Sequence, residues 1–174
     1  HSRVRRQRQM CIRDRMIHHD IPPQEFLKYV HTIDLSFMKE DKIMRDELIN
    51  LDMEKFIFTN GSAEHAENIL SHLGVYDLFG RDKVFDIQDA GYVPKPEAKT
   101  FDLMLNKFKI NPKETIYIED IAKNLGIGHE RGCYTVWLIN DEHFGKIDSN
   151  KDYISHKIEN LSLFLKEIRL LKNK

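Results

Sequence analysis

The chain has 174 residues, of which 41% are hydrophobic and 32% charged, so it is long enough to bury the core of one globular domain. No apolar run approaches the roughly 18 residues that a membrane-spanning helix needs. Two cysteines are too few for a disulfide framework. These features favour a cytoplasmic protein that does not span a membrane, and they leave its oligomeric state open.

The net charge of −1 is unevenly distributed along the chain. Residues 1–15 hold six of the 27 Lys and Arg residues but only one of the 28 Asp and Glu residues. A basic arm on an acidic domain can bind nucleic acid. However, the run Met10–Asp14 looks like the translated end of a transposon used to prepare sequencing libraries. We therefore interpret residues 1–15 as a non-native scar and expect no nucleic-acid partner.

Two helical patterns precede the first strand pattern. Apolar residues recur at helical spacing in residues 26–33, after Pro22-Pro23, and again at Met44, Leu48 and Leu51. From residue 54 onward, short apolar runs alternate with helical patterns. The predicted strands lie at 55–59, 84–87, 115–118 and 134–138. The predicted helices are one at 63–73, one from 96 to 108, a short one that ends near Gly132, and one around 161–168. This alternation predicts an α/β fold with a doubly wound parallel sheet and helices on both faces.

Ligands of such sheets bind beyond the carboxyl ends of the strands, and polar residues follow three of the predicted strands or lie close to them. These are Thr59-Asn60, Lys95 and Glu119-Asp120. Alone, each has a simple explanation, as a helix cap, a solvated lysine or an acidic N-terminus. Together they supply a hydroxyl and N–H groups for a phosphate, a cation fixed between two prolines, and oxygen ligands for Mg²⁺. The set predicts a phosphoryl-transfer site without a nucleophile.

Three segments that carry these residues resemble the second, third and fourth motifs of the haloacid dehalogenase superfamily. They are Phe58–Ser62, Tyr92–Pro96, and Ile118–Asp120 with Asn124. The resemblance implies a Rossmann-like core over residues 54–174, a remnant of a helical cap over residues 16–53, and a Mg²⁺-dependent phosphatase. It also implies roles for the site residues: Thr59, Asn60, Gly61 and Lys95 bind phosphate, Thr59 and Lys95 act in catalysis, and Asp120 holds the metal with help from Glu119.

Two further segments resemble the pyrimidine 5'-nucleotidase branch of that superfamily. They are Phe26–His31 followed by Asp34-Leu35, and Asn60–Ser62 followed by His65-Ala66. This branch implies a nucleoside monophosphate as the substrate. Phosphatases for sugar phosphates and phosphoglycolate share the general motifs and stay as alternatives. A phosphorelay receiver domain has a similar residue set, but its acidic pair comes first in the chain.

The superfamily's nucleophile is the first Asp of an Asp-x-Asp motif at the end of the first core strand, which should precede the cap helices. Asp14 lies in the suspected scar, and neither Asp34 nor Asp52 follows a strand. The resemblance therefore implies a chain without its nucleophile, inactive by itself, and without the first strand between those that end at Thr59 and Asp120. Such a loss exposes two strand edges, so we expect poor folding or a rearranged sheet. A non-catalytic phosphate- or protein-binding remnant is the alternative function.

Overall fold

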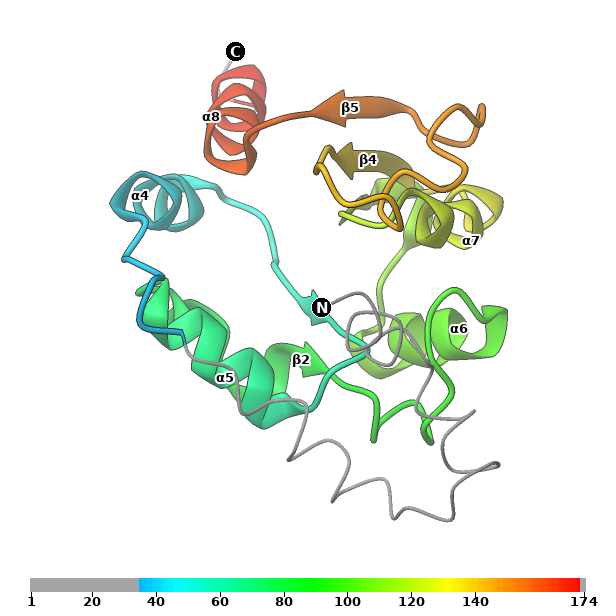
Figure 1. Ribbon diagram of the computed structural model, residues 1–174, viewed down its shortest axis with the longest axis horizontal. Helices are drawn as coiled ribbons and strands as arrows, with labels where there is room; N and C mark the ends of the chain where they lie inside the picture. The colour runs from blue at the N-terminus through cyan, green and yellow to red at the C-terminus, as the bar shows by residue number, and fades with distance from the viewer. Residues whose placement is uncertain (1–34, 173–174) are drawn as a thin grey trace. The chain divides into compact units, whose positions relative to one another are not determined.

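The computed structural model describes residues 35–172 of the chain (Figure 1). The helical pattern at 26–33 and the suspected scar at 1–15 lie outside this range. The described elements follow one another as α4 (Lys42–Asn50), β1 (Ile57–Phe58), α5 (Ala63–His72), β2 (Val84–Phe85), α6 (Ala98–Phe108), β3 (Ile116–Glu119), α7 (Leu125–Arg131), β4 (Tyr134–Leu138), β5 (His156–Ile158) and α8 (Leu161–Lys172). The predicted alternation of strand and helix is confirmed, and β5 is a strand that the sequence did not predict.

All strand pairs in the described part of the chain are parallel, as predicted for an α/β fold. They form two separate sheets, one of β1 and β2 and the other in the order β3-β4-β5. The prediction of an α/β class with parallel strands is therefore confirmed. Within residues 35–172 no strand of one sheet pairs with a strand of the other, and the expected loss of the superfamily's first strand stays a prediction.

The described residues divide into two compact units. One contains residues 35–40 and 55–94, and the other contains residues 41–54 and 95–172. The first unit holds β1, α5 and β2, with Val84, Phe85 and Ile87 buried. The rings of Phe58 and Phe85 meet edge to face, with their centroids 5.6 Å apart. The hydroxyl of Ser62 accepts a hydrogen bond from the N–H of His65 and caps α5, as the sequence predicted.

The second unit is built on the three-stranded sheet. Val136 on β4, Ile158 on β5 and Phe164 on α8 form a buried apolar cluster. Helix α7 approaches β3 closely at Gly128, where a side-chain Cβ would lie only 2.5 Å from the ring of Tyr117. Glycine is therefore needed at this position for the helix to pack on the strand.

Helix α4 belongs to this second unit and packs on α8, and Figure 1 shows the two helices side by side. The guanidinium of Arg169 donates two hydrogen bonds to the carboxylate of Glu47, at 2.6 and 3.1 Å. Helix α4, the last part of the segment assigned to a cap, thus finds partners for its buried face and for Glu47 on α8. The assignment of residues 16–53 to a cap stays a prediction. None of the helices within residues 35–172 is long and apolar enough to cross a membrane.

Candidate functional site

The loop after β1 is organised by hydrogen bonds of its own. The hydroxyl oxygen of Thr59 accepts a hydrogen bond from the N–H of Gly61 at 2.9 Å, and the N–H of Thr59 donates to the carbonyl of Phe85 at 3.0 Å. Because the hydroxyl of Thr59 accepts from within the loop, its own hydrogen is left to donate to a ligand. The N–H of Gly61 is directed at Thr59, so a phosphate at this loop would rely first on the hydroxyl.

Asp86, at the end of β2, is a residue that the sequence analysis missed. It is 1% exposed, and one carboxylate oxygen accepts a hydrogen bond from the N–H of Ala63, the first residue of α5, at 2.9 Å. The other oxygen accepts from the N–H groups of Gln88 and Asp89, at 3.0 and 2.9 Å. The N-terminus of α5, expected to cradle a phosphate, thus already binds an internal carboxylate. The position of Asp86 at the carboxyl end of a strand is the signal that could have identified it from the sequence.

Lys95 and Glu119, predicted from different strand ends, form a buried ion pair. The ammonium nitrogen of Lys95 lies 2.7 Å from Oε2 of Glu119, and the two side chains are 8% and 7% exposed. The side-chain amide of Asn124 donates to the other oxygen of Glu119, also at 2.7 Å, and the hydroxyl of Tyr117 lies 3.4 Å from Oε2. The cation is therefore held in one place by a carboxylate that is itself fixed on both oxygens. Helix α6 starts at Ala98, two residues beyond the Pro96 expected to start it.

Burial raises the pKa of Tyr117 well above its usual value, and the negative charge of Glu119 adds to this effect. Tyr117 is therefore a hydroxyl donor at neutral pH and not a phenolate. Tyr117, Asn124 and Lys95 thus surround the carboxylate of Glu119 with a neutral hydroxyl, an amide and a cation.

Asp120, the residue after β3, is exposed. Its backbone carbonyl accepts hydrogen bonds from the indole N–H of Trp137 at 3.0 Å and from the side-chain amide of Asn140 at 2.7 Å. Neither donor was predicted from the sequence as a site residue. They belong to β4 and to the loop beyond it, so three segments meet at this strand end.

The expected metal ligands, Asp120 and Glu119, have different surroundings. Within residues 35–172, no three His, Cys, Asp or Glu side chains come together in a way that could hold a metal ion. Proteins commonly hold Mg²⁺ with one or two carboxylates, and water and substrate phosphate supply the other ligands. The exposed Asp120 fits as one such carboxylate. Both oxygens of Glu119 already accept hydrogen bonds, so it fits better as the partner of Lys95.

The structure thus brings Lys95 and Glu119 together with Asn124, and Asp120 follows directly on the same strand end. Thr59, Asn60 and Gly61 belong to the other compact unit, beside Asp86. Parallel strands with polar residues at their carboxyl ends define a Rossmann-type α/β protein. The chain belongs to the haloacid dehalogenase-like hydrolases, because the model of that family matches residues 44–130, half of the chain.

Solved structures share this fold at low sequence identity. An L-2-haloacid dehalogenase from Xanthobacter autotrophicus, solved with chloropropionic acid covalently bound, matches with a TM-score of 0.56 and 15% identity over 72% of this chain and 59% of its own. A haloacid dehalogenase family hydrolase from Deinococcus radiodurans, solved with bound phosphate and sodium, matches with a TM-score of 0.62 and 19% identity. This match covers 92% of this chain and 72% of the hydrolase. A β-phosphoglucomutase from Clostridium difficile matches with a TM-score of 0.55 and 15% identity, over 86% of this chain and 64% of the mutase. The chain thus spans about three fifths of the dehalogenase.

Proposed function

We propose that the protein carrying this chain is a Mg²⁺-dependent phosphomonoester hydrolase that acts on pyrimidine nucleoside 5'-monophosphates. The observation that supports this most strongly is the buried cation of Lys95, held at the end of β3 by Glu119, whose other oxygen accepts a hydrogen bond from Asn124. A fixed cation in a site with little water stabilises the charge that develops on a transferred phosphoryl group. The similar fold of the Deinococcus hydrolase, which contains bound phosphate, also favours a phosphate ligand.

In this proposal the site residues have different tasks. The hydroxyl of Thr59 donates to a phosphoryl oxygen, and Asn60 and Gly61 form the loop that presents it. Lys95 neutralises phosphate charge and orients the nucleophile. Asp120 holds Mg²⁺, which supplies further positive charge to the phosphate when it is bound. Glu119 keeps Lys95 in place instead of holding the metal.

The nucleophile in this proposal is an aspartate of the superfamily's first motif, outside residues 35–172, which would form an aspartyl-phosphate. Asp86 lies at a strand end but cannot take this role, because it is almost fully buried and accepts three backbone hydrogen bonds. The β-phosphoglucomutase neighbour favours a second candidate substrate, a sugar phosphate.

The test is a hydrolysis assay on the native protein that contains this chain, with nucleoside monophosphates, sugar phosphates and phosphoglycolate, each with and without Mg²⁺. We expect Mg²⁺-dependent release of phosphate, fastest from pyrimidine nucleotides. Lys95→Ala should lower kcat about 100-fold or more, as the loss of one preorganised charge does in other enzymes. Lys99→Ala, which removes an exposed lysine of α6, serves as the control and should retain full activity. No Mg²⁺-dependent turnover of any ester would refute the proposal.

A further inference from the structure

We infer that Trp137 and Asn140 are positioning residues that fix the backbone of Asp120 and thereby aim its carboxylate. This inference rests on the proposed function, because it assigns a task to residues around the proposed metal ligand. Asp120 itself would touch the metal. Trp137 and Asn140 would act only through it.

The geometry at the carbonyl of Asp120 is the first observation. A carbonyl oxygen has two lone pairs, and here both accept from side chains, the indole of Trp137 at 3.0 Å and the amide of Asn140 at 2.7 Å. The donors stand 17 and 20 residues further along the chain. The peptide that follows Asp120 is therefore held from another part of the fold and not by its local turn.

Each donor is itself fixed. Trp137 is 5% exposed and lies on β4 opposite Glu119, and the ammonium of Lys157 lies 5.7 Å from the centre of its ring. The side-chain oxygen of Asn140 accepts from the N–H of Glu142 at 3.0 Å. Neither donor therefore depends on Asp120 to hold its orientation.

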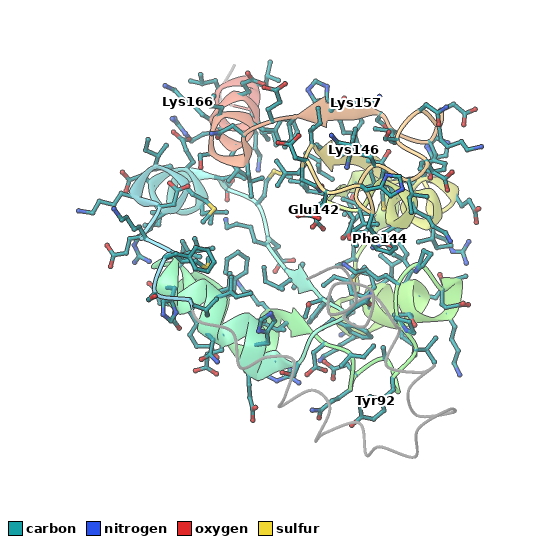
Figure 2. All side chains as sticks on the ribbon, viewed as in Figure 1. Tyr92, Glu142, Phe144, Lys146, Lys157 and Lys166 are labelled. Atoms are coloured by element: carbon teal, nitrogen blue, oxygen red, sulfur yellow. The ribbon has the colours of Figure 1, made fainter. Side chains whose placement is uncertain are left out.

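The loop that begins at Asn140 also holds the residue two positions beyond Asp120. The N–H of Ala122 donates to the carbonyl of Gly145 at 3.0 Å. Gly145 is buried, and a Cβ there would lie 2.4 Å from the side chain of Asn140, so only glycine leaves room for that amide. Figure 2 labels Glu142, Phe144 and Lys146 along this loop. Hydrogen bonds at 120 and 122 together fix the segment that carries the acidic side chain.

A purely structural explanation covers only half of this arrangement. A buried indole N–H needs an acceptor, and that need alone accounts for Trp137. It does not account for Asn140, which is only partly buried and could bond to water instead. Two donors on one carbonyl fix the plane of the peptide that follows Asp120, and together with the hydrogen bond at Ala122 they limit the directions open to its side chain. Partners of this kind, which orient a metal ligand, typically contribute 10- to 100-fold to metal affinity.

The test uses Trp137→Phe, which removes the N–H donor and keeps a buried aromatic ring, and Asn140→Ala, which removes the second donor. Calorimetric titration with Mg²⁺, on the native protein that contains this chain, measures the affinity of the wild type and of both variants. We expect each variant to bind Mg²⁺ about 10-fold more weakly, with the substrate KM at saturating Mg²⁺ changed less than about twofold. Lys146→Ala, whose ammonium faces the exposed Asp141 in the same loop, is the control and should bind Mg²⁺ as the wild type does.

Three outcomes would overturn the inference. If the wild type hydrolyses phosphate esters with Mg²⁺ and both variants bind Mg²⁺ normally, the positioning role is wrong and the proposed function stands. If the variants lose only thermal stability, the hydrogen bonds are purely structural. If the wild type shows no Mg²⁺-dependent turnover, the proposed function fails and the inference fails with it. Should Trp137→Phe not fold, Asn140→Ala, at a partly exposed position, decides the question alone.

Discussion

Replacement of Lys95 by Met tests the ion pair at the centre of the candidate site. Met keeps most of the side-chain volume and removes the charge that lies 2.7 Å from Glu119. Because both side chains are more than nine-tenths buried, solvent cannot replace the lost partner. Removing one member of a buried pair typically costs about 3–5 kcal/mol. Asn124 and Tyr117 still donate to Glu119, so we expect a loss near the lower limit, about 3 kcal/mol.

The assay is urea unfolding at pH 7, followed by circular dichroism and extrapolated linearly to water. The double variant Lys95→Met/Glu119→Gln leaves no buried charge unpaired, so it should be less destabilised than the sum of the two single variants by about 2 kcal/mol. Lys99→Met, at an exposed position of α6, should change stability by less than about 0.5 kcal/mol. A loss below about 1 kcal/mol for Lys95→Met, or strict additivity in the double variant, would refute this reasoning.

Two further predictions concern the second compact unit. Gly128→Ala places a Cβ 2.5 Å from the ring of Tyr117 and should cost about 1–3 kcal/mol of stability. Gly126→Ala, whose Cβ would lie 3.5 Å from its nearest neighbour, should be tolerated. Equal melting temperatures of the two variants would contradict the close approach of α7 to β3. The hydrogen bond from Arg169 holds the pKa of Glu47 below its usual value, so the stabilisation by this carboxylate is present above the usual Glu pKa and is lost as pH falls through the lowered value. In urea unfolding, Glu47→Gln should therefore be less stable than the wild type at pH 7 and approach it as the pH falls below the usual Glu pKa. A difference that stays constant with pH would contradict the prediction.

Local patterns were sufficient to predict most of the elements. Strand β4 was predicted at its observed bounds, and the cap of α5 at Ser62 followed from the turn chemistry of Asn60–Ser62. Strand β5 was missed because only Ile158 of its three residues is buried. A strand with two exposed polar residues has no hydrophobic pattern that a sequence window can detect.

The candidate site was predictable in part. Lys95 and Glu119 were both singled out, because the carboxyl ends of parallel strands meet at one edge of a sheet. Their pairing was not foreseen, since consecutive strand residues point to opposite faces and the sequence does not say whether Glu119 or Asp120 turns inward. Trp137 was not singled out as a site residue. Its acceptor lies 17 residues away, so local spacing carried no sign of it.

The division into two units has a practical consequence for cutting the chain. The backbone passes from one unit to the other after residues 40, 54 and 94, so no single cleavage can separate them. A protease that nicks the chain between Pro94 and Lys95 leaves α4 on the first fragment, although its partner α8 lies on the second. The contact between Glu47 and Arg169 would then join two separate polypeptides. Co-expressed halves divided at this point should therefore reassemble by fragment complementation.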